Sequence, residues 1–310
     1  MANPQVRTFA LFAVIIALFV VVGSILGEYL FNSYLAGLVV AFGLSLAINL
    51  VSYFFCDRFV LWANNAQVVT DADAPRLAKI VRELAPQFGL VEPRLAIIRS
   101  QTPNAFATGR DERHAVVAAT EGILRLCNDR ELRGVLAHEL AHVKDRDILL
   151  MTFAATLAGA ISYAAQFVLF GQLFGGGGNN RNNGLLAIIA AVTAPIAAML
   201  IQLAISRSRE SRADEVGART IRDPEALATA LLKLEHANDA QPMTSGSPAS
   251  SSLYIVNPFR GGSFATLFST HPPIEERVER LRAMQLDFQY QPSIRSPGRP
   301  SRMTGPAARS

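Results

Sequence analysis

Four long apolar runs constrain the fold of this 310-residue chain more than any other feature. They cover Thr8–Gly27, Ser33–Phe55, Ile148–Phe174 and Leu185–Ser206, and none contains a charged residue. At about 1.5 Å per helical residue, roughly 20 residues cross a hydrocarbon layer of ~30 Å. Half of all residues are hydrophobic and 17% are charged, a balance typical of membrane proteins. The runs therefore predict four transmembrane helices, arranged as two hairpins.

Two other interpretations of these runs stay open. The first run could be a cleaved signal peptide, although it exceeds the ~7–15 apolar residues of such a signal. The third and fourth runs could instead be buried core helices, although their many Ala, Gly and Ser residues are typical of helix-packing faces in membranes. A second hairpin that does not span is the alternative to four spans.

Basic residues lie on one side of the predicted helices. The connection between the first two runs, residues 28–33, contains none, whereas the opposite ends carry Arg7, Arg58, Lys144, Arg146, Arg207, Arg209 and Arg212. The positive-inside rule then places both termini and both polar segments in the cytoplasm, at a bacterial cytoplasmic (inner) membrane. Arg181, between the third and fourth runs, is the one exception. Cys56 and Cys127 form no disulfide or metal motif, which agrees with a reducing compartment.

The apolar runs divide the chain into five parts, residues 1–55, 56–147, 148–206, 207–288 and 289–310. In the first polar part, periodicity predicts helices within 73–90 and 128–147, strands within 93–100 and 114–121, and turns over 101–113. The second polar part predicts helices within 206–221, 223–239 and 271–285, with a mobile surface linker over 240–252. The last part has no apolar period and predicts a disordered tail. The expected fold is a mainly α membrane protein with a cytoplasmic α+β domain built from two segments.

The sequence HELAH, residues 138–142, carries the clearest chemical signal. His138 and His142 are one helical turn apart, so both imidazoles can reach one metal ion, and Glu139 lies beside them as a general base. Zn²⁺ suits such ligands, and an open coordination position allows a water to be activated at neutral pH. Asn128 and Glu131 predict a capped start for this helix. The alternative is an exposed histidine pair that binds no metal.

A third ligand is expected in the sequence RESRADE, residues 209–215. Glu210 and Asp214 share a helix face, so Glu210 can bind the metal while Asp214 accepts the ring N–H of a ligand histidine. Glu215 is the competing ligand, but no carboxylate follows it four residues later. The alternative for the whole stretch is a solvated helix with surface ion pairs.

The order of these motifs resembles the HtpX-type membrane zinc metalloproteases, relatives of the CAAX prenyl proteases. The resemblance rests on TPNAFATG, on HELAH followed by an apolar hairpin, on SRSRESRADE and on STHPPIEERVERL. It implies a zincin-like (gluzincin) domain with His138, His142 and Glu210 as zinc ligands, Glu139 as the general base and Asp214 as the supporting acid.

The same resemblance implies further site residues. His271 would stabilise the oxyanion, Arg277 would lie near the site, and Asn104, Ala105, Phe106 and Ala107 would form the strand edge that pairs with substrate. From the residues alone, His271 could instead cap a helix, Arg277 could be a surface charge, and residues 104–107 could be a turn.

The expected function is hydrolysis of peptide bonds in membrane or misfolded proteins at the cytoplasmic face, in membrane-protein quality control and the stress response. The main alternative is a non-proteolytic membrane scaffold or transporter with an accidental HExxH. Prenyl-dependent CAAX proteolysis and a zinc-binding regulator without turnover are weaker alternatives, because four spans are few for an enclosed chamber and a regulator does not need Glu139. No basic stripe with interleaved aromatics is present, so nucleic acid is not an expected partner.

Overall fold

The computed structural model describes residues 32–152, 207–243, 248–259 and 272–290, together with positions 13, 16, 17, 20 and 156. The predicted spans over Thr8–Gly27 and Leu185–Ser206 lie outside this described part, apart from isolated positions, as does most of the span from Ile148. His271 and the predicted tail after residue 290 also lie outside it.

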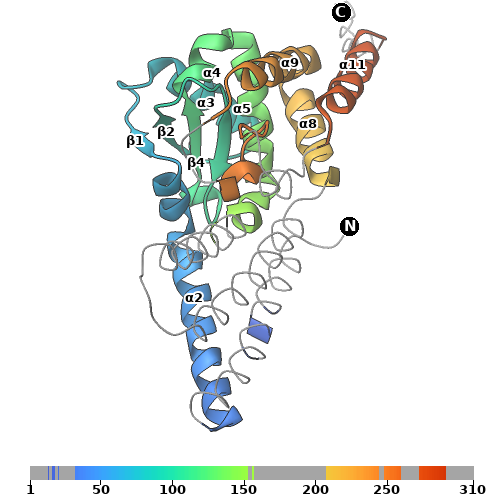
Figure 1. Cartoon of the computed structure of the whole chain (residues 1–310). Helices are drawn as coiled ribbons and strands as arrows, with labels where there is room; N and C mark the ends of the chain where they lie inside the picture. Colours follow the sequence, from blue (N-terminus) through green and yellow to red (C-terminus); the bar gives the residue numbers. More distant parts are fainter. Residues whose placement is uncertain are drawn as a thin grey trace, which may run out of the picture.

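The long helix α2, Tyr34–Ala63, extends away from the other described elements (Figure 1). Most of its large side chains up to Phe55 are exposed, and Leu35, for example, is 70% exposed. Within the described residues, α2 is the one helix with the length and apolarity to cross a membrane. The second predicted span is thus present as a helix of suitable length.

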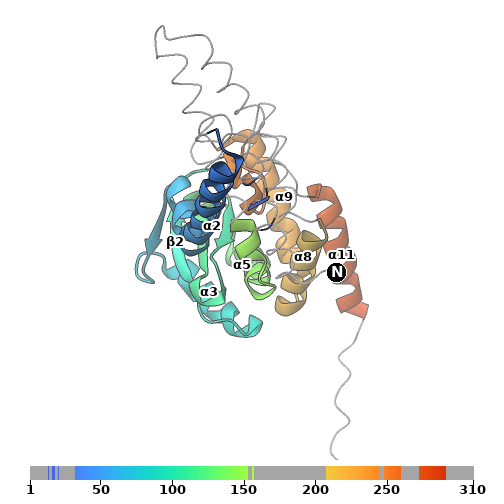
Figure 2. The ribbon, with the colours of Figure 1, turned by 90° about the horizontal axis from the view of Figure 1, so that it is seen from below.

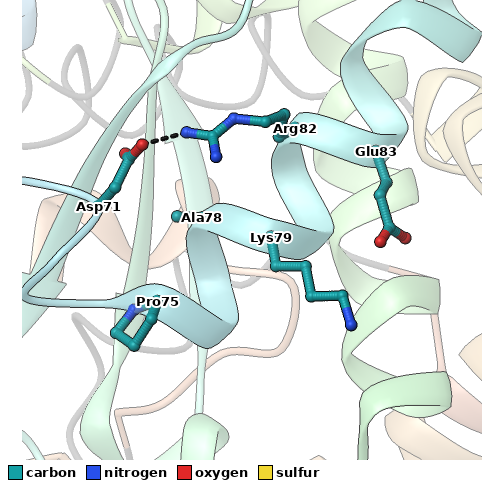
Figure 3. Close-up of a pocket in the computed structure, with 6 residues that line it drawn as sticks. All are labelled: Asp71, Pro75, Ala78, Lys79, Arg82 and Glu83. Carbon is teal, nitrogen blue, oxygen red and sulfur yellow. Dashed lines mark hydrogen bonds and ion pairs between the residues drawn. The ribbon is translucent and has the colours of Figure 1, made fainter.

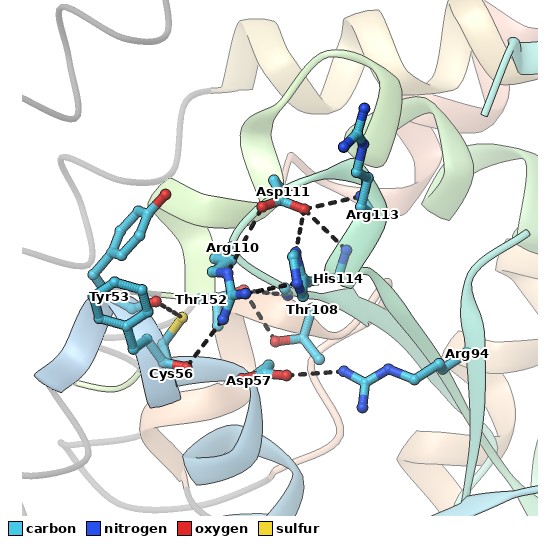
Figure 4. Close-up of polar contacts among 12 residues, drawn as sticks. Tyr53, Cys56, Asp57, Arg94, Thr108, Arg110, Asp111, Arg113, His114 and Thr152 are labelled. Carbon is cyan, nitrogen blue, oxygen red and sulfur yellow. Dashed lines mark hydrogen bonds and ion pairs between the residues drawn. The ribbon is translucent and has the colours of Figure 1, made fainter. Parts of the chain in front are cut away.

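The end of α2 differs from the prediction, because the helix continues eight residues past Phe55. Asp57 does not stop it, since the carboxylate Oδ2 lies 3.0 Å from Nη2 of Arg94 on the neighbouring sheet (Figure 4). Cys56 and Val60 are 0% and 1% exposed, so this last part of α2 packs against the domain. A charged residue whose partner comes from elsewhere in the fold is therefore compatible with helix continuation.

The sheet has four strands in the order β1-β2-β4-β3. The parallel central pair, β2 (Arg94–Ile98) and β4 (Val116–Thr120), confirms the two predicted strands. The antiparallel outer strands β1 (Ala66–Val69) and β3 (Ala105–Thr108) were not predicted from periodicity, and β3 lies in the stretch expected to be turns. Alanine has little strand preference, so the pairing of β3 with β4 decides its conformation.

The predicted helices of both polar segments are confirmed. They are α3 (Pro75–Phe88), α5 (Asp129–Lys144), α8 (Arg207–Ile221), α9 (Pro224–Ala240) and α11 (Ile274–Tyr290). Short elements α4 (Glu121–Leu126), η1 (Glu112–His114) and η2 (Pro248–Leu253) connect them. Asn128 and Glu131 form the predicted capping box of α5, and Asp223 caps α9.

Helix α5 is the centre of the domain. It lies between α3 and α8 (Figure 2) and also packs on α9 and β3. Its side chains from Leu132 to Val143 are almost all buried, including both histidines of HELAH. The backbone of α8 approaches α5 closely at Gly217, where an added Cβ would lie 3.0 Å from the backbone N of His138. The candidate site therefore lies inside the domain.

The predicted mobile linker is wrong for its described C-terminal end. Ser250 and Ser251 are 2% and 1% exposed, and Tyr254 is fully buried. Tyr254 packs edge-on against Phe106 and its hydroxyl donates to Asn64 Oδ1 at 3.2 Å. The aromatic anchor after the Ser-rich stretch holds residues 248–256 against the sheet, which composition alone did not indicate.

Candidate metal centre

The two histidines of HELAH face each other on α5. Their Nε2 atoms are 3.2 Å apart, their rings are nearly perpendicular, and His138 and His142 are 1% and 3% exposed. Helical spacing brings the rings to one point, and burial removes them from competing water. The predicted alternative of an exposed pair does not describe this geometry.

Glu210 reaches the histidine pair from α8. Its Oε1 lies 3.5 Å from His142 Nε2 and its Oε2 lies 3.7 Å from His138 Nε2. The three residues are buried and offer ligand atoms that all lie within 4.8 Å of one another. Glu215, the competing ligand, is exposed and pairs with Arg219 on the surface of the same helix. The structure therefore brings Glu210, and not Glu215, to the histidines.

These three residues fit a tetrahedral zinc ion. Bonds of about 2.0–2.1 Å at tetrahedral angles separate ligand atoms by about 3.3 Å, close to the distances between the two Nε2 atoms and the Glu210 oxygens. Two imidazoles and one carboxylate are also a ligand set of catalytic zinc sites, which keep a further position open. A buried carboxylate next to two imidazoles would be well compensated by a divalent cation.

Asp214 connects the histidine pair to α11. Its Oδ1 lies 2.9 Å from His138 Nδ1, and Arg277 donates to both of its oxygens at 2.9 and 2.7 Å. Arg277 is fully buried and also donates to the Ile255 carbonyl at 3.0 Å. Burial alone would raise the pKa of Asp214, but Arg277 and His138 outweigh it and hold the pKa at about 2. An acceptor that is ionised at neutral pH thus faces the ring nitrogen that points away from the metal position.

Glu139 is held between α5 and the sheet edge. Its Oε2 accepts the backbone N–H of Ala107 at 2.8 Å, while its buried Oε1 has no hydrogen-bond partner within the described residues. Burial, reinforced by the charge of Glu210, raises the pKa of Glu139 to about 8. One carboxylate oxygen is therefore fixed, and the other is available to a molecule in the site.

His142 has a carboxylate of its own that the sequence analysis did not consider. Asp147 Oδ2 lies 3.8 Å from His142 Nδ1, and Asp147 Oδ1 lies 3.7 Å from Nε of Arg209. Burial alone would lower the pKa of His142, but Glu210, Asp147 and Glu139 outweigh it and raise the pKa to about 9. The only sequence signal for Asp147 was its position five residues after His142.

The edge of β3 is partly occupied by the chain itself. Ala105 O accepts the N–H of Ile255 at 3.2 Å, and the Asn104 side chain bonds both backbone groups of Val256. Phe106 pairs with Ala118 of β4 and is fully buried. Of the four residues expected at the substrate edge, Ala107 donates a hydrogen bond to Glu139 of the HELAH motif.

Other polar features lie apart from this centre. A surface depression on α3 contains none of the predicted site residues and is lined by Asp71, Pro75, Ala78, Lys79, Arg82 and Glu83 (Figure 3). His114 bonds Asp111 and Arg110 near the end of α2 (Figure 4).

A buried HExxH helix completed by a glutamate from a second helix defines a metal-dependent peptidase. The chain belongs to peptidase family M48, whose profile matches residues 71–285. It is a metalloprotease, its cofactor is a metal ion, and its substrates are polypeptides.

The similar curated proteins agree with this assignment. A protease HtpX homolog of Thermococcus kodakarensis is 51% identical over 279 residues, which cover 89% of this chain and 94% of the relative. A protease HtpX homolog of Ralstonia pickettii is 46% identical over 289 residues, covering 92% and 98%. The crystal structure of S. mikatae Ste24p aligns with 89% of this chain and 64% of its own at 18% identity, with a TM-score of 0.45. The assignment rests on the family match and the sequence relatives.

Proposed function

We propose that this protein is a zinc endopeptidase of the bacterial cytoplasmic membrane that cuts membrane or misfolded proteins at the cytoplasmic face. The observation that carries the proposal is the buried group of His138, His142 and Glu210, with Glu139 beside it. The scaffold alternative is not favoured, because a buried ligand set with a correctly placed base is not expected of an accidental motif.

Zinc, when bound by these three residues, supplies a Lewis acid that polarises the scissile carbonyl and makes water acidic enough to lose a proton near neutral pH. Glu139 accepts that proton on Oε1 and passes it to the leaving amine. Burial raises the pKa of Glu139 in the metal-free site, and a bound divalent cation would lower it again, which favours the ionised carboxylate that a general base needs. The Ala107 N–H keeps the carboxylate in place throughout.

Substrate backbone would pair with β3 at Ala107. Its N–H points away from β4 towards Glu139, so by the alternation of an antiparallel ladder its carbonyl points outward too. That carbonyl can accept a substrate N–H in an added strand. Asn104, Ala105 and Phe106 would support this edge, while their own polar groups stay bonded within the chain.

Two further residues complete the proposal. Arg277 would act as a positioning residue, because within the described residues its side-chain hydrogen bonds go to Asp214 and Ile255 and its side chain is fully buried. His271 is retained from the family resemblance as the group that stabilises the oxyanion.

The membrane assignment is supported by α2. Its exposed apolar part, followed directly by a buried part packed on the protease domain, would keep the metal site close to the bilayer surface. Such an enzyme suits substrates that are themselves held in the membrane, which supports a role in quality control under stress.

The proposal is tested by casein digestion and zinc content in detergent, with Glu139→Gln, Glu210→Gln and Glu215→Gln compared with wild type. Glu139→Gln should bind one zinc and lose at least 100-fold in activity, roughly the contribution of general acid–base catalysis. Glu210→Gln should lose zinc, whereas Glu215→Gln, its exposed neighbour, should match wild type. Zinc-independent cutting by Glu139→Gln, or zinc loss in Glu215→Gln instead, would refute the assignment.

The orientation is tested with single exposed cysteines. The native Cys56 and Cys127 are buried, so a membrane-impermeant maleimide should report only added positions. In intact spheroplasts, Asn32→Cys should be labelled and Asp287→Cys should be protected until the membrane is opened. The reverse pattern would place the protease domain outside the cytoplasm.

A further inference from the structure

The turn that ends α5 places a second buried carboxylate beside the metal centre. Arg146 adopts a left-handed conformation with φ of 59°, which is uncommon for a residue with a side chain. A two-residue turn, Asp145 and Arg146, separates α5 from the next helical stretch, which begins at Asp147 with 4% exposure. This turn brings Asp147 back to His142 on the helix that it follows.

Asp147 repeats the arrangement of Asp214 for the other histidine. Asp214 lies between His138 Nδ1 and the guanidinium of Arg277. Asp147 lies between His142 Nδ1 and the guanidinium of Arg209, at 3.8 and 3.7 Å. Each candidate ligand histidine therefore has one buried carboxylate facing its far ring nitrogen, with one arginine behind that carboxylate. The Asp214 contacts are hydrogen-bond distances, whereas those of Asp147 are longer, and His142 Nδ1 has no hydrogen-bond partner within the described residues.

The tautomer of His142 explains why this carboxylate matters. When Nε2 binds a metal, the remaining ring proton must be on Nδ1, the atom that faces Asp147. A carboxylate acceptor there fixes the ring orientation and makes the histidine a stronger ligand. Because Arg209 directly precedes Glu210, the same carboxylate also holds the segment that supplies the third ligand.

We propose that Asp147 is a positioning residue of the metal centre, which orients His142 and, through Arg209, holds Glu210 opposite the histidine pair. The inference rests on the proposed zinc site and assigns the residue no contact with substrate. Asp147 thereby links the two polar segments that together form the site.

The test measures zinc affinity of the full chain in detergent, by competition with a chromophoric chelator. Asp147→Ala should weaken zinc binding about 10–100-fold, the usual effect of removing such a support, and Asp147→Asn at least about threefold. The matched control is Asp145→Asn, which removes a neighbouring carboxylate from the same turn. Asp145 pairs with Arg212 of α8 at 2.5 Å and, within the described residues, forms no ion pair with a histidine. The control should bind zinc as wild type does.

The outcomes separate this inference from the proposed function. Wild type that binds no zinc overturns both. Wild type that binds zinc, with both Asp147 variants binding equally tightly, overturns only the role of Asp147. An equal loss of zinc affinity in Asp145→Asn would show that general docking of α8 is responsible. It would then overturn the proposal that Asp147 orients His142. Metal-free Asp147→Asn should still unfold cooperatively in a thermal melt, and if Asp147→Ala does not fold, Asp147→Asn decides.

Discussion

The buried pair between Arg277 and Asp214 gives the strongest single prediction about stability. Arg277→Met keeps the side-chain length but leaves Asp214, which is 5% exposed, without its main counter-charge. The pKa of Asp214 falls from 3.8 to about 2 on folding, which corresponds to about 2 kcal/mol. Burial works against this lowering, so Arg277 and His138 together contribute more than that. Breaking a buried pair by removing one partner costs about 3–5 kcal/mol, and we expect a loss in this range.

The assay is thermal unfolding of metal-free protein in detergent. At about 2–4 °C per kcal/mol for a domain of this size, Arg277→Met should lower the Tm by roughly 6–20 °C. The double variant Arg277→Met/Asp214→Asn should be more stable than Arg277→Met alone, because it removes the unpaired buried charge. Arg282→Met on the same helix is the control, since its pair with Glu225 is largely exposed and worth less than about 1 kcal/mol.

Two results would refute this reasoning. If Arg277→Met lowers the Tm no more than Arg282→Met does, the buried pair contributes no net stability. If the double variant is less stable than the single one, the penalty does not come from the uncompensated carboxylate, and Asp214 must stabilise the fold through His138 instead.

Two further predictions concern helix packing and pH. Gly217→Ala should weaken zinc binding without unfolding the domain, because its Cβ would lie 3.0–3.1 Å from the His138 and Ala137 backbone and must push α8 away from α5. The control in the same chelator assay is Gly43→Ala, where an added Cβ meets open space. Equal zinc affinities of the two variants would contradict the prediction. Because folding lowers the pKa of Asp214, the ionised carboxylate stabilises the fold above pH ~4, and this stabilisation is lost as the pH falls towards 2. Between pH 5 and 2, the free energy of unfolding of metal-free wild type should therefore fall by about 2 kcal/mol more than that of Asp214→Asn, as followed by Tm. Parallel loss in both proteins would assign the acid sensitivity to other groups.

Local signals in the sequence were sufficient for much of the fold. The capping box at Asn128 and the helical spacing of HELAH depend on residues a few positions apart, and both α5 and its capped start are present as predicted. Periodicity missed strand β3, which only the family resemblance implied, because Ala105–Thr108 forms a strand by pairing with β4 and local sequence preference does not show this. The Ser-rich end of the linker was misjudged because its burial depends on Tyr254, whose partners Asn64 and Phe106 are distant in the chain.

The surroundings of the site were less predictable than its ligands for the same reason. The sequence was compatible with Arg277 as a surface charge, whereas in the fold it is fully buried. The position of Asp147 depends on the left-handed conformation of Arg146, which no sequence pattern predicts. Residue types at helical spacing predict which side chains can meet. The residues that support those side chains are determined by contacts between elements that are distant in the sequence.

The division of the ligands between two segments has a consequence for assembly. His138 and His142 are brought together by one turn of α5, so this half of the site can form locally. Glu210 arrives only when α8 docks on α5, and docking is supported by the close approach at Gly217 and by the Asp147–Arg209 and His138–Asp214 pairs. Zinc binding must then favour the docked arrangement, since a ligand that needs all three residues stabilises only the state that presents them. The metal would serve both as the catalyst and as the final link between the two halves of the protease domain.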